Sequence, residues 1–160
     1  MSHHEKNYLL LVLLHVGLGV AIYLLPALSQ VYAVLIVAIG LFWVIKNRNR
    51  GEEVLMVSAY IVGSEVFLRM TGGNPLYEFS KYGVMLFILL GMYFSGFSRF
   101  AIAYWIYMAL LVPGIIIATY ALDYDTDIRK VISFNISGPL CLGISALYTY
   151  VRRITIQHFS

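Results

Sequence analysis

Long apolar runs alternate with short polar stretches along the whole 160-residue chain. Six of the runs approach the roughly 20 apolar residues that an α-helix needs to cross about 30 Å of hydrocarbon. The pattern therefore predicts an all-α, polytopic transmembrane helical bundle of about six spans, built as one domain over residues 1–160. The predicted spans cover residues 8–25, 28–45, 54–68, 82–97, 100–122 and 131–151.

Three of these runs allow a second interpretation. The runs 28–45 and 54–68 are short, so together they could form a re-entrant pair instead of two full crossings. The run 8–25 could be a cleaved signal peptide, but its apolar region exceeds the roughly 7–15 residues of such a segment. The start "MSHHEKN" is also only weakly basic, and "ALS" at 27–29 is a poor cleavage site. We expect a retained helix.

The composition supports a lipid environment. Hydrophobic residues make up 61% of the chain and charged residues 12%, which is about half the usual charged share of a soluble domain. Exposed apolar surface of that extent aggregates or binds something, and the lipid bilayer is the expected partner. The net charge of +3 comes from scattered loop bases. No basic stripe of the kind that binds nucleic acid is present. Cys141 is the only cysteine, so a disulfide framework is excluded.

The distribution of Lys and Arg predicts the orientation, because short cytoplasmic loops carry the excess of these residues. With six spans and a cytoplasmic N-terminus, seven bases fall inside and four outside. The inner bases are Lys6, Lys46, Arg48, Arg50, Arg99, Arg152 and Arg153, and the outer ones are Arg69, Lys81, Arg129 and Lys130. Both termini are therefore expected in the cytoplasm.

One stretch, "EVFLRMTGGNPLYEFSKYG" from Glu65 to Gly83, gathers two acids and two bases around a turn. Glu65 precedes Arg69 by four positions, the favourable order for an ion pair on a helix. Glu78 and Lys81 are three apart and can pair in the same way. We expect these pairs to fix helix ends at the outer interface, since pairing lowers the cost of charges near lipid.

The same bases allow a ligand interpretation. Arg69, Lys81 and Arg129 all lie on the predicted outer side, where they could face a phosphate or pyrophosphate. Arginine suits that role because its planar fork makes two parallel bonds to phosphate oxygens. The two interpretations are compatible, since an ion pair can hold an arginine ready for a ligand.

No catalytic residue, metal site or cofactor site is expected from the motifs. The stretch "DYDTDIRK" from Asp123 lacks the Gly and Glu of an EF-hand, with Ile128 and Phe134 in their places. Its Asp-Tyr-Asp also matches the loose DxD pattern of metal-using glycosyltransferases, but a solvated acidic loop is the expected identity. His15 stands alone, and we expect it to bond to a neighbour instead of forming a relay.

Two segments resemble a known family. "RNRGEEVLMVSAYIVGSEVFLRMTGGNPLYEFSKYGVMLFILLG" from Arg48 and "TDIRKVISFNISGPLCLGISALYTYVRRIT" from Thr126 resemble the N-terminal half of bacterial O-antigen ligase/polymerase membrane proteins. That resemblance implies a multi-pass protein of the bacterial inner membrane that acts in lipopolysaccharide and surface polysaccharide biosynthesis. Family members are glycosyltransferases that take a glycan from an undecaprenyl-pyrophosphate carrier on the periplasmic side.

The resemblance also implies what residues 1–160 would need. The family's chemistry depends on a large periplasmic loop between later helices, and this sequence stops before it. We therefore expect the chain to be inactive alone, as a truncated product, a split subunit or a fragment, with the C-terminal half or another assembly protein as partner. A small non-catalytic membrane scaffold or accessory subunit is the alternative. A small transporter fits less well, because Pro113-Gly114 and Gly138-Pro139 do not occupy matching positions of two repeats.

Overall fold

The computed structural model describes residues 3–76, 78–121, 128–150 and 152, with side chains described from residue 5 onward except those of residues 118–119, 121 and 128–135. Every regular element in these ranges is an α-helix, and the six predicted helices are confirmed. Each helix ends within two residues of its predicted end. They are α1 (His3–Leu24), α2 (Ala27–Asn47), α3 (Glu53–Met70), α4 (Phe79–Ser95), α5 (Ile102–Ala121) and α6 (Ile128–Thr149).

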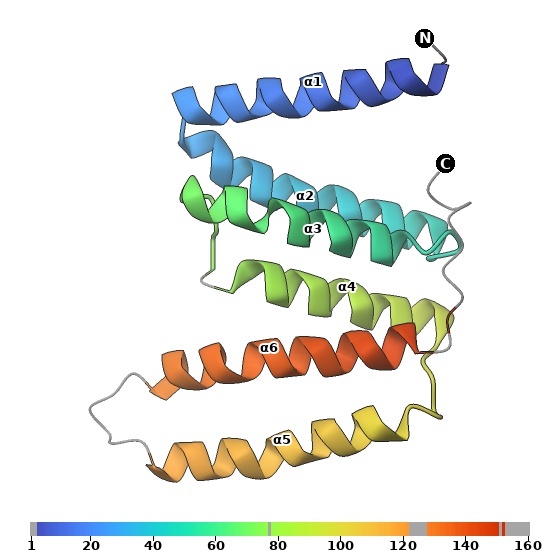
Figure 1. Cartoon of the computed structure of the whole chain (residues 1–160), viewed down its shortest axis with the longest axis vertical. Helices are drawn as coiled ribbons and strands as arrows, with labels where there is room; N and C mark the ends of the chain where they lie inside the picture. Colours follow the sequence, from blue (N-terminus) through green and yellow to red (C-terminus); the bar gives the residue numbers. More distant parts are fainter. Residues whose placement is uncertain (1–2, 77, 122–127, 151, 153–160) are drawn as a thin grey trace.

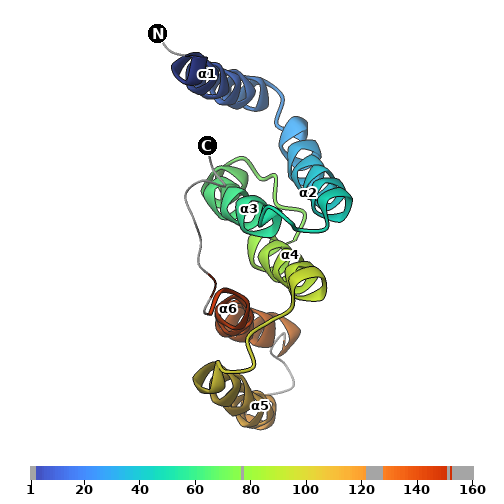
Figure 2. The same ribbon diagram turned by 90° about the vertical axis from the view of Figure 1, so that its right-hand side faces the viewer.

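The helices form one open, gently bent layer (Figures 1 and 2). Successive helices run in opposite directions, and the order across the layer is α1, α2, α3, α4, α6, α5. The helix that follows α4 in the chain, α5, is therefore not its neighbour in the layer, because α6 lies between them. Because the layer does not close, most helices bury one narrow face on each neighbour and leave two faces open.

The best-packed part of the layer lies where α2, α3 and α4 meet. Its buried members are mostly aliphatic and include Tyr148, which reaches in from α6. Gly91 of α4 makes this contact possible, because a Cβ there would lie only 2.9 Å from carbon atoms of the Tyr148 ring. The buried residues are Ile36, Val44, Val54, Val57, Ile61, Val84, Phe87, Ile88 and Tyr148.

The "TGG" sequence stops α3 in a defined way. The Gly72 N–H donates to the Arg69 carbonyl at 3.3 Å and the Gly73 N–H donates to the Leu68 carbonyl at 2.8 Å, the paired bonds of a Schellman motif. Gly72 has φ +68°, where glycine is free of strain. Gly73 packs so closely on Ser29 of α2 that no side chain would fit. The turn therefore fixes where α3 ends.

The open faces of the layer are apolar. The segments Glu5–Leu24 and Ala27–Asn47 are each long and apolar enough to cross a membrane, with mean hydropathy of 2.0 and 2.3. Only 6% and 22% of these windows is buried against the rest of the protein. Both segments are therefore little enclosed by the other described residues. Shorter apolar helices cover Phe79–Ser95, Ile102–Ile117 and Ile136–Thr149.

Candidate functional site

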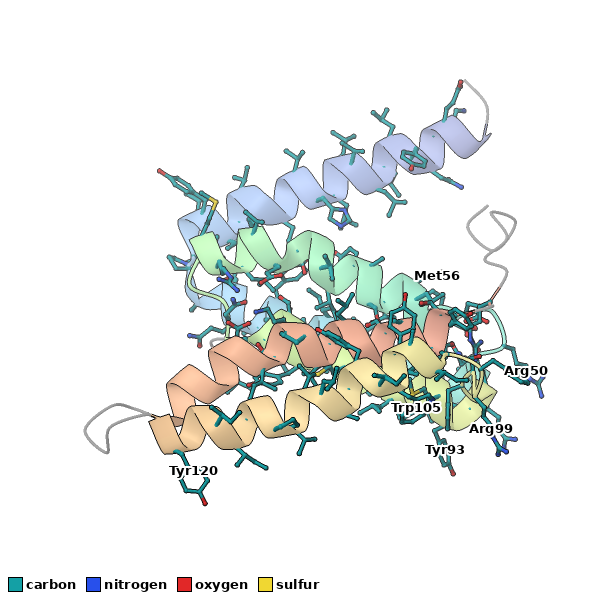
Figure 3. The ribbon with its side chains drawn as sticks, turned by 60° about the horizontal axis from the view of Figure 1, so that its bottom comes forward. Arg50, Met56, Tyr93, Arg99, Trp105 and Tyr120 are labelled. Carbon is teal, nitrogen blue, oxygen red and sulfur yellow. The ribbon has the colours of Figure 1, made fainter. Side chains whose placement is uncertain are left out.

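Polar and charged side chains collect at the two ends of the layer, because the helices alternate in direction. We name these ends by the arginine that each carries. The Arg50 end holds the α2–α3 connection, and Arg99, Tyr93 and Trp105 lie at that end too (Figure 3). The Arg69 end holds the α3–α4 connection, and Tyr120 lies at that opposite side of the layer. Arg50 and Arg99, two bases predicted on the inner side, thus lie at the end opposite to the α3–α4 connection.

At the Arg69 end, the predicted pair within α3 is confirmed. The Arg69 guanidinium donates to the Glu65 carboxylate at 2.7 Å, with 46% of the Arg69 side chain and 26% of the Glu65 side chain exposed. One guanidinium N–H takes part in this bond, and guanidinium has five. The pair therefore holds Arg69 in place and leaves donors for an anion.

The second predicted pair is confirmed at the start of α4. Lys81 Nζ lies 2.6 Å from a Glu78 carboxylate oxygen, and the Glu78 side chain is 2% exposed. Lys81 also donates to the Ser137 hydroxyl of α6 at 3.5 Å. The other carboxylate oxygen, Glu78 Oε1, has no hydrogen-bond partner among the described residues. The pair is more buried than the first one, so its charges are less available to a ligand from solvent.

The structure thus places Glu65, Arg69, Glu78 and Lys81 at one end, as two local pairs. The side chain of the third anion candidate, Arg129, lies outside the described residues, as does the loop 122–127 that holds the Asp-Tyr-Asp motif. Lys81 connects α4 to α6, whereas Arg69, near the end of α3, is bonded only within its own helix among the described residues and is partly exposed. Arg69 is therefore the best placed of the described candidates to meet an anion.

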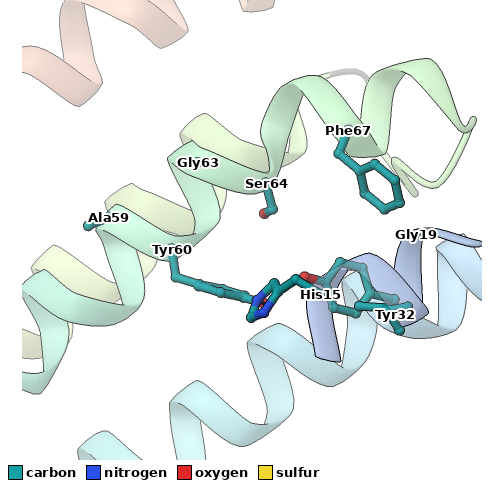
Figure 4. Close-up of a pocket in the computed structure, with 9 residues that line it drawn as sticks. His15, Gly19, Tyr32, Ala59, Tyr60, Gly63, Ser64 and Phe67 are labelled. Carbon is teal, nitrogen blue, oxygen red and sulfur yellow. Dashed lines mark hydrogen bonds between the residues drawn. The ribbon is translucent and has the colours of Figure 1, made fainter. Parts of the chain in front are cut away.

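A cavity of about 340 Å³ lies between α1, α2 and α3 (Figure 4). Three polar side chains join the helices there. The hydroxyls of Tyr32 and Tyr60 lie 2.7 Å apart, and the Tyr60 hydroxyl lies 2.9 Å from His15 Nε2. His15 is thus bonded to a neighbour, as predicted, and that neighbour is Tyr60 of α3. A second cavity, of about 540 Å³, lies between the same three helices and is lined almost entirely by apolar residues.

The direction of these hydrogen bonds follows from one fixed acceptor. His15 Nδ1 lies 2.8 Å from the Leu11 carbonyl, which can only accept, so Nδ1 carries the proton. In a neutral imidazole Nε2 must then accept from Tyr60. The Tyr60 hydroxyl in turn accepts from Tyr32. This chain of bonds ties α1 to the rest of the layer.

The Arg50 end contains a polar cluster that the sequence does not reveal. Arg152 Nη1 donates to Glu52 Oε1 at 2.8 Å, and the Tyr148 hydroxyl donates to Glu52 Oε2 at 2.9 Å. The Asn49 amide donates to the Tyr148 hydroxyl at 2.7 Å and to the Ser95 hydroxyl at 2.9 Å. Arg152 also caps the carbonyls of Ser95 and Gly96. The cluster fastens the α2–α3 connection to α4 and α6.

This cluster was missed because its members are distant in the sequence. Glu52 and Arg152 are 100 positions apart, so no helical spacing pairs them. The only local signal is the run "NRNRGEE", in which Asn49 precedes Arg50-Gly51 as in a turn. The satisfied bonds of the cluster point to a structural role.

Two groups of hydrogen-bonded side chains, one around Tyr60 and one around Glu52 and Arg152, join helices to one another. Arg69 differs from them, because it is partly exposed and is restrained by Glu65. Among the described residues, no three His, Cys, Asp or Glu side chains come together as metal ligands would. Comparison with protein-family models, with curated proteins and with solved structures gave no match to this chain.

Proposed function

We propose that residues 1–160 form the membrane-embedded N-terminal portion of a bacterial inner-membrane protein of O-antigen or lipopolysaccharide assembly. In this proposal, the protein belongs to the ligase/polymerase type that uses an undecaprenyl-pyrophosphate-linked glycan. The Arg69 end faces the periplasm, and Arg69 borders the carrier's pyrophosphate. Residues 1–160 alone turn over no glycan, since the family's catalytic loop lies in a further segment or a partner.

The arrangement of polar and apolar surface supports the membrane part of this proposal. The helical lengths suit the bilayer, because 17 residues of α4 span about 26 Å and 22 residues of α1 about 33 Å at 1.5 Å per residue. The open faces carry large apolar side chains such as Leu10, Phe42 and Ile117, each more than half exposed. Water would penalise that surface, whereas lipid tails do not.

The observation that carries the ligand part is the state of Arg69. Its partner Glu65 restrains the side chain, yet nearly half of the side chain remains exposed. An arginine restrained in this way loses less entropy when it binds an anion. Its remaining N–H groups match two oxygens of a phosphate. These features favour a pyrophosphate neighbour at the periplasmic surface.

The test is carrier binding by the purified chain in detergent micelles, measured with undecaprenyl pyrophosphate. We expect Arg69→Ala to weaken binding about tenfold or more, the loss of a charge-assisted hydrogen bond. Arg69→Lys should also weaken binding, because a point charge cannot replace the planar fork. Glu65→Gln keeps the guanidinium and should have a smaller effect.

The matched control is Arg99→Ala, since Arg99 is an exposed arginine at the Arg50 end. It should leave carrier binding unchanged. If Arg69→Ala lowers protein abundance while the surviving protein binds normally, the Glu65–Arg69 pair is only structural. An equal loss in Arg99→Ala would show that binding follows overall charge, which contradicts a site at Arg69.

A non-catalytic membrane scaffold is the second candidate function. The open layer favours it, because α2, α3 and α4 expose apolar faces such as those of Val62 and Leu86 on which other membrane helices could pack. This candidate predicts no carrier binding and a stable complex with another polysaccharide-assembly protein. Co-purification from mild detergent, together with the carrier-binding measurement, separates the two candidates.

A further inference from the structure

A polar cavity of about 370 Å³ lies at the Arg50 end, on the side of the protein away from Arg69. Cations dominate its lining, with three bases against one carboxylate. All of the lining residues come from the α2–α3 connection and the adjoining helix ends. They are Lys46, Asn47, Arg48, Arg50 and Glu53.

Two acids, Glu52 and Glu53, lie in or next to the α2–α3 connection, and each accepts hydrogen bonds from other groups. Glu52 accepts from Arg152 and Tyr148. Glu53 is 5% exposed, and its Oε2 accepts the Gly51 N–H at 3.0 Å. Among the described residues, neither Arg48 nor Arg50 has a carboxylate within ion-pair distance. The cavity therefore keeps an excess of positive charge, because three bases line it against the single carboxylate of Glu53.

The backbone of the connection is held in an uncommon conformation. Arg48, Asn49 and Glu52 have φ of 52°, 54° and 57°, a region that side chains other than glycine seldom occupy. Arg48 stands where a helix usually ends on glycine, since its N–H donates to Ile45 and the next N–H donates to Val44. Glycine would form this cap without strain, yet an arginine is present. Such local strain is typical of positions with a function.

The side chain of Asn49 fixes this conformation. It accepts the Val54 N–H at 3.0 Å and donates to Ser95 and Tyr148. Asn49 is buried, whereas Arg48 and Arg50 on either side are exposed. In Figure 3 the Arg50 side chain points away from the helices. The two arginines are thus carried on a backbone that does not have to reorganise when a ligand binds.

We propose that this cavity binds a phosphate group, in which Arg48 and Arg50 contact the oxygens and Lys46 supplies further positive charge. Arginine forks match the geometry of phosphate oxygens. The group is either the headgroup of an anionic phospholipid in the adjacent leaflet or a free phosphate. The lipid source rests on the membrane placement proposed above, whereas the free source does not.

The experiment uses the full chain in detergent micelles, with phosphatidylglycerol against phosphatidylcholine as one arm and inorganic phosphate as the other. Native mass spectrometry counts retained lipid, and titration calorimetry measures phosphate. Arg48→Asn is the suitable variant, because asparagine tolerates the left-handed backbone. Arg50→Gln is a second, independent variant. Each should weaken binding about fivefold, the effect of one base near a phosphate surface.

The control is Arg99→Gln, which removes a base from the same end but not from the cavity lining. Preferential retention of phosphatidylglycerol, reduced by Arg48→Asn and Arg50→Gln only, supports the lipid source. Binding of inorganic phosphate with the same dependence supports the free source. Equal effects of all three variants, or neither lipid preference nor phosphate binding in the unchanged protein, would overturn the site. Carrier binding at Arg69 is measured separately, so failure of one proposal is distinguishable from failure of the other.

Discussion

The Arg152 guanidinium carbon lies over the Tyr148 ring, 4.0 Å from the ring centre, while its Nη1 donates to Glu52 at 2.8 Å. Arg152 thus donates a hydrogen bond to the α2–α3 connection, at Glu52, and also packs on the Tyr148 ring that enters the core. Its Nε also donates to the Tyr148 carbonyl and so caps the end of α6. Because these contacts share one side chain, we expect their effects on stability to be coupled.

Replacing Arg152 with Met should therefore destabilise the protein strongly. The change keeps an apolar stem but removes one of the two donors to the Glu52 carboxylate, whose other donor is Tyr148. It also leaves the carbonyls of Ser95 and Gly96, at the end of α4, without the Arg152 donor. Hydrogen bonds to charged groups contribute about 1.5–3 kcal/mol each, so we expect a loss of about 3 kcal/mol. Thermal unfolding in detergent gives the measurement. Arg99→Met is the control and should change the unfolding temperature little, since Arg99 is exposed.

Gly91→Ala should disrupt the contact between α4 and α6. The added Cβ would meet the Tyr148 ring at 2.9 Å, and the ring cannot retreat because its hydroxyl is bonded to Asn49 and Glu52. Overpacking of this kind costs about 1–3 kcal/mol. Gly63→Ala is the matched control, since no atom lies within 4 Å of its added Cβ. A neutral Gly91→Ala would show that α4 and α6 are not held this closely.

Tyr60→Phe should loosen α1. The change removes the hydroxyl that lies between His15 and Tyr32 and leaves both groups without that partner. We expect a loss of about 1–2 kcal/mol, the cost of unmade hydrogen bonds. A disulfide engineered between α1 and α3 should also form more slowly. Tyr23→Phe serves as the control, because Tyr23 is 83% exposed, and an equal effect there would argue against the hydrogen-bonded chain.

The proposed orientation can be tested by labelling. In a Cys141→Ser background, Arg69→Cys should react in intact cells with a maleimide that crosses the outer membrane but not the inner one. Arg50→Cys should react only after the inner membrane is permeabilised. The reverse pattern would place Arg69 in the cytoplasm and remove the basis for a periplasmic pyrophosphate site.

The helices were predictable because the apolar runs and their polar breaks are local signals. The ion pairs Glu65–Arg69 and Glu78–Lys81 were predictable for the same reason, since helical spacing alone brings each pair together. The order of helices across the layer was not, because apolar faces that contact lipid or another helix look alike in sequence. The Glu52–Arg152 contact depends on that order, so it could not be inferred without the structure.

The position of α6 between α4 and α5 bears on how the chain is assembled during synthesis. The ribosome makes α4 and α5 before α6. Until α6 is made, the face of α4 that later packs on α6 has no partner helix. Tyr148 lies on that helix and Arg152 follows its end. Only after both are made can Asn49 and Glu52 form their hydrogen bonds to them. Packing of α6 would thus be the last step of assembly. It would rigidify the α2–α3 connection, which is made 100 residues earlier.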